Sequence, residues 1–313
     1  MGWKTPGMRK TIILFLIFNL LGLEYLNAQR KKNRFLDRCE TIYGIGVTNF
    51  LGELGGSDGY GTNGLKDLEF SFTRPTVHLG FRYRKSPTIS YKFNYTQGWV
   101  AGRDSFTRET YRRNRNLSFK SPIIETSFQV EVSLLQLKST RSRYKLQGVR
   151  GKSGIDMNLY LFGGVGGFFF NPHANYSGKW VALQPIGTEG QGIAASRKKY
   201  SRVQACFPIG FGFRFPLLNK NWTMGFEYGM RITTTDYIDD VSSTYYSPTL
   251  VSDKYGYVAA KLSNRSLIPS EVPTSAVTGQ QRGDPTDKDS YMFGIITASY
   301  RLKSGKSVLP KFR

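Results

Sequence analysis

Residues 222–246 read WTMGFEYGMRITTTDYIDDVSSTYY, and the first half of this stretch alternates strictly between two kinds of side chain. Successive side chains of a β-strand face opposite sides, so the alternation predicts a strand with one continuous apolar face. The apolar set is Trp222, Met224, Phe226, Tyr228, Met230 and Ile232; the opposite set is Thr223, Gly225, Glu227, Gly229 and Arg231. A soluble sandwich hides its apolar residues, whereas a membrane barrel turns them to lipid and keeps polar residues in its lumen. The stretch therefore indicates a membrane barrel.

The same alternation recurs along the chain and predicts eight strands, an even number that closes an antiparallel outer-membrane β-barrel. Long connections follow the first, third, fifth and seventh strands, as expected for outer loops, and short turns follow the second and sixth. The facing of the last strand is ambiguous, because both of its residue sets mix apolar and small side chains. The expected strands span residues 41–50, 74–84, 88–99, 122–136, 154–169, 200–215, 222–232 and 290–303.

Composition agrees with an all-β barrel. The 313 residues include 19 Tyr, 22 Phe and 34 Gly, which suit aromatic girdles and small lumen positions. The mean hydropathy of −0.36 does not contradict this, because alternating strands cancel in any averaging window. A net charge of +22 is typical of nucleic-acid binders. An export signal argues against nucleic acid here, so anionic lipid headgroups or an acidic partner are expected instead.

The N-terminus has the layout of a secretory signal: basic residues, the apolar run 11–23, and a small residue at Ala28 before Gln29. Either Met1 or Met8 could be the start. We expect a signal peptide over residues 1–28, a periplasmic basic lead over 29–40, the outer-membrane barrel over 41–303 and a basic periplasmic tail over 304–313. The expected location is the cell outer membrane.

The predicted lumen is crowded with charge. An eight-stranded barrel is just wide enough for side chains to fill, and charges held there need partners. We therefore expect a plugged core of interlocked ion pairs, and we favour that over an ion path. The predicted lumen charge network consists of Arg74, Arg82, Arg84, Lys92, Glu125, Glu131, Asp156, Arg214, Glu227 and Arg231.

Chemistry-bearing residues are few. A barrel lipid hydrolase would need a His near a Ser and an acid, but His78 is predicted inside the lumen among arginines. His173 falls in an outer loop. The acidic residues Asp236, Asp239 and Asp240 lack the spacing of a calcium loop, so a solvated loop face is expected. Cys39 and Cys206 could pair, although pairing is not favoured. We expect no enzyme activity, cofactor or small-molecule substrate.

The connection over residues 137–153 is longer than a periplasmic turn requires, and it interleaves basic with apolar side chains. A basic loop alone would rest on lipid headgroups, whereas the apolar residues give a protein partner something to bury. We leave the lipid reading open and predict that this segment docks a partner, with Arg141, Arg143 and Tyr144 central.

Two stretches carry a family resemblance: GIGVTNFLGELGG over residues 44–56 and TTTDYIDDVSSTYY over residues 233–246. They resemble PorG-like barrel proteins of the type IX secretion system of Bacteroidota. The resemblance implies an outer-membrane barrel bound to the periplasmic ring of the lipoprotein PorK and of PorN. It also implies a role in protein secretion and, in gliding species, in motility. The alternatives are an OmpA-like structural barrel or surface adhesin and, less favoured, the lipid hydrolase.

Overall fold

The computed structural model describes residues 35–52, 54, 72–106, 110–137, 156–217, 221–267 and 277–303. The chain divides into two compact units. The first combines Met1–Cys39 with Arg301–Arg313; in its described part, Leu36–Arg38 forms the 3₁₀ turn η1, and Leu302 donates its N–H to the Cys39 carbonyl at 3.0 Å. The second unit, Glu40–Tyr300, contains the barrel.

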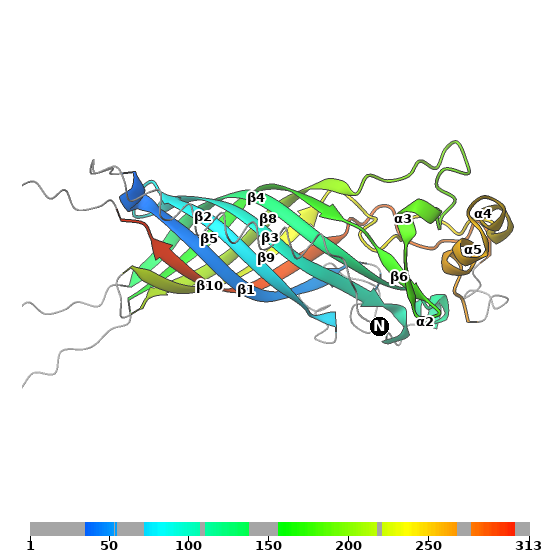
Figure 1. Ribbon diagram of the computed structural model, residues 1–313, viewed down its shortest axis with the longest axis horizontal. Helices are drawn as coiled ribbons and strands as arrows, with labels where there is room; N and C mark the ends of the chain where they lie inside the picture. The colour runs from blue at the N-terminus through cyan, green and yellow to red at the C-terminus, as the bar shows by residue number, and fades with distance from the viewer. Residues whose placement is uncertain are drawn as a thin grey trace, which may run out of the picture. The chain divides into compact units, whose positions relative to one another are not determined.

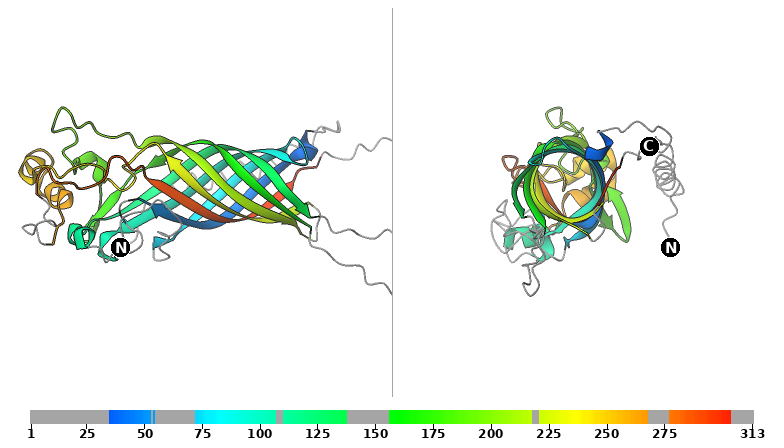
Figure 2. Two further views of the ribbon diagram at one scale, coloured as in Figure 1. Left: turned by 180° about the vertical axis from the view of Figure 1, so that it is seen from behind. Right: turned by 90° about the vertical axis from the view of Figure 1, so that its left-hand side faces the viewer.

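Eight antiparallel strands close into a ring in the order β1-β2-β3-β4-β5-β8-β9-β10, with β10 returning to β1 (Figures 1 and 2). Closure leaves no unpaired backbone edge, which is the condition for strands to cross lipid. The predicted fold class and strand count are therefore confirmed. The strands are β1 Cys39–Leu51, β2 Arg74–Arg84, β3 Ile89–Arg103, β4 Ser118–Leu137, β5 Met157–Phe170, β8 Val203–Pro216, β9 Trp222–Thr233 and β10 Ser290–Arg301.

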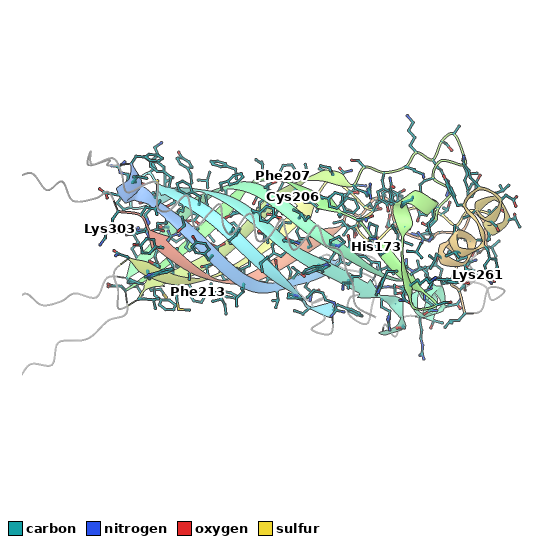
Figure 3. The ribbon with its side chains drawn as sticks, in the orientation of Figure 1. His173, Cys206, Phe207, Phe213, Lys261 and Lys303 are labelled. Atoms are coloured by element: carbon teal, nitrogen blue, oxygen red, sulfur yellow. The ribbon has the colours of Figure 1, made fainter. Side chains whose placement is uncertain are left out.

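The inward and outward faces follow the predicted alternation. In β9, Glu227 and Arg231 are buried, while Phe226 and Tyr228 are half-buried on the other face. Figure 3 shows Phe207 and Phe213 on the outside of β8. The apolar exterior of a closed barrel places the chain in the outer membrane, in contact with lipid. No helix in the described part of the chain is long and apolar enough to span a bilayer.

The inward face of β10 settles the strand whose facing was ambiguous. Tyr291, Phe293 and Ile295 are buried, whereas Ile296 is 55% exposed. Tyr291, Phe293 and Ile295 belong to an apolar cluster in the half of the lumen that the long loops cover. Loop residues Ile238 and Val241, both fully buried, belong to the same cluster. The lumen therefore holds an apolar layer in addition to the predicted ion pairs, and the sequence analysis did not predict this layer.

The connections at the two ends of the barrel differ in length, as predicted. At one end, which we call the outer end, the loops carry further elements (Figure 1). Among them, the hairpin β6–β7 extends the sheet beyond β4 through the pair Lys120–His173. The hairpin and the loop helices were predicted only as irregular loops. The outer-end elements are η4 Asp104–Phe106, α2 Thr110–Arg115, β6 His173–Tyr176, β7 Lys179–Ala182, α3 Leu183–Ile186, α4 Pro248–Tyr255 and α5 Tyr257–Ser263.

Candidate functional site: the lumen and the outer cap

Ion pairs cross the lumen between strands that are not neighbours. Lys92 on β3 places its Nζ 2.5 Å from Glu227 Oε2 on β9, on the opposite side of the ring. Glu131 on β4 receives Arg82 Nε from β2 at 2.8 Å and Arg214 Nη1 from β8 at 2.8 Å. Isolated charges in this interior would cost several kcal/mol each, so each carboxylate needs a cationic partner. The network ties the walls of the barrel to one another.

Toward the outer end, a second pair joins the charges to the apolar layer. Arg231 Nε lies 3.1 Å from Glu125 Oε2, and the Tyr291 hydroxyl donates to the same oxygen at 3.0 Å. The Arg231 guanidinium also covers the Phe293 ring, 4.3 Å from its centroid. Cation, carboxylate and aromatic rings thus pack together at this level of the shaft, as the small bore of an eight-stranded barrel allows.

Lumen glycines make room for aromatic rings. A Cβ on Gly212 would lie 2.5 Å from the Tyr160 hydroxyl, which donates to Glu227 Oε1 at 2.8 Å. A Cβ on Gly229 would lie 2.6 Å from the tip of the Phe162 ring. Glycine is therefore needed at both positions so that these rings can enter the shaft.

The structure brings together most of the predicted lumen network but not all of it. Arg84 pairs with Glu40 and is less deeply buried than the central residues. Arg74 is half-buried at the outer end, where its Nη1 donates to the Thr73 carbonyl at 3.4 Å. Asp156 is exposed and precedes β5, so it lies outside the shaft and not in it as predicted. The predicted network residues that are buried in the shaft are Arg82, Lys92, Glu125, Glu131, Arg214, Glu227 and Arg231.

Glu40 belongs to the network although it was expected in the basic lead. It is 1% exposed and accepts from Arg82 Nη1 at 3.0 Å. The strand β1 begins at Cys39, two residues before the predicted start. The alternation that places Ile42 inside also places Glu40 inside, so extending the pattern by two residues would have found it.

A buried polar cluster closes the outer end; we call it the outer cap. It consists of Thr188, Glu189, Asp239, Asp240, Arg282 and Asp289, all nearly inaccessible to solvent. Arg282 Nη1 lies 2.7 Å from Glu189 Oε1 and donates to the Asp240 carbonyl at 2.6 Å. Asp239 and Asp289 accept the backbone N–H groups of Leu54 at 3.2 Å and Ile238 at 2.8 Å. These bonds hold residues 234–247 across the end of the barrel.

Asp240 has the most unusual electrostatics in the outer cap. Burial raises its pKa to about 7, against the opposing effects of Arg282, Thr188 and Tyr200. The Tyr200 hydroxyl donates to Asp240 Oδ1 at 2.7 Å, but Arg282 Nη2 is 4.0 Å from Oδ2. Arg282 lies closer to Glu189 than to Asp240, so its positive charge offsets the burial of the Asp240 carboxylate only in part.

The acidic trio is therefore not the solvated loop face that was predicted. Asp236, Asp239 and Asp240 are all at most 2% exposed, and Asp239 and Asp240 accept hydrogen bonds from the chain itself. No group of residues that could hold a metal ion occurs in the described ranges. The sequence suggested polar loop residues; it gave no sign that they fold back over the lumen.

The remaining candidates have structural surroundings. His78 is 1% exposed inside the barrel, and its Nδ1 lies 2.9 Å from Thr96 Oγ1. His173, expected in a loop, begins β6. Cys39 and Cys206 are buried thiols that do not form a disulfide. The predicted docking residues Arg141, Arg143 and Tyr144 lie outside the described residues, as do the basic lead over 29–34 and the tail over 304–313.

Comparison with solved structures finds small outer-membrane barrels at low identity. The attachment invasion locus protein Ail of Yersinia pestis, solved with a heparin analogue, is 12% identical; the match covers 85% of this chain and 99% of Ail, with a TM-score of 0.35. Neisserial surface protein A is 4% identical over 84% and 96% of the two chains, with a TM-score of 0.35. The N-terminal barrel of Pseudomonas aeruginosa OprF is 8% identical over 84% and 98%, with a TM-score of 0.31.

No curated protein matches the sequence. A family model does match, over residues 12–176, which is more than half of the 313-residue chain. The matched part includes the first five barrel strands, and with them the lumen residues Arg82, Lys92, Glu125 and Glu131. The chain thus belongs to the family described as a domain of unknown function, DUF6089.

Proposed function

We propose that this outer-membrane barrel is a non-enzymatic component of the type IX protein secretion system that anchors a periplasmic ring of PorK-like and PorN-like proteins. The observation that carries the proposal is the filled shaft. Ion pairs such as Lys92–Glu227, below an apolar layer around Tyr291, leave a barrel that holds its place in the membrane rather than passing a substrate. The function of such a barrel lies in the partners that it binds at its periplasmic and outer ends.

Two sequence features direct the proposal to the periplasmic end. The resemblance of residues 44–56 and 233–246 to PorG-like barrels implies that the periplasmic ring is the partner. The sequence of the connection after β4 supports the periplasmic contact, because it interleaves basic residues with apolar ones that a protein can bury. Arg141, Arg143 and Tyr144 are proposed as its centre.

Co-purification tests this proposal. In a gliding or type IX-secreting host, the triple variant Arg141→Ala, Arg143→Ala and Tyr144→Ser should assemble in the outer membrane and lose the ring components. Tyr and Arg are the residues most often found at the energetic centres of interfaces, so the loss should be large. Folding is followed in the same preparation by the heat-dependent shift of the barrel on gels.

A matched triple is available on the outer end: Lys254→Ala, Lys261→Ala and Tyr257→Ser, all on exposed positions of α4 and α5. It also removes two positive charges and one tyrosine, and it should keep the ring at the wild-type level. Retention of the ring by the Arg141 triple would refute this segment as the contact. Absence of any ring protein from the wild-type preparation would refute the secretion role itself.

A structural or adhesive barrel is the second candidate, and the outer end favours it. The helices α4 and α5, with the hairpin β6–β7, give this end an ordered surface rather than bare turns. A surface adhesin without a secretion role would purify without periplasmic partners and would bind host or neighbouring cells through this end. Cell-binding assays on wild type and on a deletion strain separate the two candidates.

A further inference from the structure

A hollow lined by cations lies where β2, β3 and β4 meet the hairpin β6–β7 at the outer end; we call it the rim pocket. Its volume is about 690 Å³, within the range of roughly 300–1,000 Å³ that small-molecule sites occupy. The described side chains that line it include no carboxylate. Those that matter here are Arg74, Arg103, Lys120, Asn175, Trp180 and Arg265.

The carboxylate of Asp104, which follows Arg103 in the chain, has partners of its own. Asp104 accepts Arg115 Nε at 2.8 Å and Arg115 Nη2 at 2.9 Å, and it also accepts the Leu117 N–H at 3.1 Å. Burial, and after it the neighbouring charge of Arg103, lowers the pKa of Arg265 despite the opposite effect of Asp104. The two arginines therefore repel each other, and an anion placed between them would relieve that repulsion.

Arg265 is held at the pocket by the fold. Its Nη1 donates to Ser118 Oγ at 3.0 Å at the start of β4, and its carbonyl accepts from Asn116 at 3.5 Å. Two residues further, the N–H of Leu267 donates to the carbonyl of Asn114 at 3.0 Å. A long cation fixed in this way loses less conformational freedom when it binds a ligand.

The position of the rim pocket along β3 and β4 places it near the membrane surface. Trp99 on β3 is paired with Pro122, and Arg103 is paired with Ser118 further along the same two strands. Four residues of a tilted strand rise by roughly 10 Å. Trp99 is of a residue type that marks the membrane interface. Arg103 and Lys120 are exposed; Arg103 lies that far outward of Trp99, and Lys120, which is paired with Ala101, lies about half as far. The headgroup layer of an outer leaflet occupies this level.

We propose that the rim pocket binds phosphate groups carried on a saccharide, such as the phosphorylated headgroup of an outer-leaflet glycolipid. Arg103, Lys120 and Arg265 would hold the phosphates, because arginine forks and phosphate oxygens make strong charge-assisted bonds. Trp180, 44% exposed on β7, offers an apolar ring face and an N–H donor beside the amide of Asn175. The proposal is independent of the secretion role.

Binding to the full-length protein, refolded in detergent free of glycolipid, tests the site by native mass spectrometry. The probes are diphosphorylated lipid A, its dephosphorylated form and soluble glucosamine 1,6-bisphosphate. We expect the double variant Arg103→Gln and Lys120→Gln to weaken binding of the phosphorylated lipid by at least roughly tenfold. Both residues are exposed, so folding should be unaffected. The control, Lys261→Gln with Lys288→Gln, removes two exposed outer-end charges that do not line the pocket and should change binding less than twofold.

The probes separate the two sources of the same chemistry. Binding of the lipid but not of the soluble bisphosphate supports a membrane headgroup as ligand, whereas binding of both supports a site open to free saccharide phosphates. Equal binding of the phosphorylated and dephosphorylated lipids would overturn the proposal, because the cations would then play no part. Equal weakening by the control pair would overturn it as well, because general surface charge would then explain the binding.

Discussion

Lys92 and Glu227 meet across the full width of the barrel, with 2.5 Å between Nζ and Oε2. The two residues are separated by 135 positions in sequence and come from β3 and β9, which face each other in the ring. Lys92 is completely buried and Glu227 is nearly so. A pair of this kind forms only when the barrel closes, so it fixes which strands face one another.

Breaking this pair should destabilise the barrel strongly. Lys92→Met leaves Glu227 without its closest cation in a buried site, which costs about 3–5 kcal/mol in comparable buried pairs. The free energy of unfolding, measured by urea titration in lipid vesicles, should fall by about that amount. Arg82 Nη2, 3.6 Å from Glu227, offsets part of the loss.

The double variant Lys92→Met with Glu227→Gln provides the control. It removes the stranded charge, so it should be more stable than Lys92→Met alone, and the thermodynamic cycle gives the coupling between the two residues. Additive effects of the two single substitutions would show that the pair contributes no coupling energy.

The sequence predicted the walls of this barrel well because one face of each strand must be apolar. That constraint repeats every second residue, and it placed Glu227 and Arg231 in the lumen and Phe226 outside. It failed for β10, whose inward residues Tyr291 and Phe293 are as apolar as its outward ones. Both faces of a strand can be apolar where the lumen itself has an apolar layer.

The structure of the outer end could not be predicted from the alternation of side chains. Asp239 and Asp240 look like exposed loop residues, and only the tertiary arrangement of Arg282, Asp289 and Leu54 explains their burial. Contacts between positions so far apart leave no local pattern in the chain. Asp156 was misplaced because the predicted strand began at residue 154, whereas β5 begins at Met157.

The filled shaft should not conduct as a porin does. Arg82, Glu131 and Tyr160 each have at most 2% of their surface exposed, so no aqueous path of porin width passes between them. Pure refolded protein in planar bilayers should give no large steady openings at either polarity. A wide porin reconstituted in parallel shows that the assay detects such openings; steady large openings from this protein would contradict a plugged lumen.

A charge on the lipid face should impair the barrel according to its depth. Phe226 lies on the outward face near the middle of β9, opposite Phe213 of β8. Phe226→Arg should lower the free energy of unfolding in vesicles by about 2–4 kcal/mol, the cost of a basic residue near the bilayer midplane. Val203→Arg, at the exposed outer start of β8, should cost about 0–1 kcal/mol. Equal costs at the two sites would contradict the assigned membrane position.

The outer cap should become more stable as the pH falls below neutral. Burial raises the pKa of Asp240 to about 7 from an ordinary value of 3.8. Between these two values the folded cap binds more protons than the opened one, so its stability rises as pH falls from about 7 toward about 4 and stays level above 7. Opening of the cap is followed by amide exchange at Ile238 and Val241, whose side chains are fully buried beneath it.

Asp240→Asn isolates this effect, because asparagine is isosteric and cannot ionise. The backbone of Asp240 has a φ of 66°, a left-handed conformation that asparagine also adopts readily. Comparing the variant with wild type at each pH cancels the intrinsic pH dependence of exchange. At pH 8 the variant cap should exchange more slowly than wild type, because wild type carries the buried charge there; at pH 4.5 the two should converge. The same difference at both pH values would mean that ionisation of Asp240 does not set the stability of the cap.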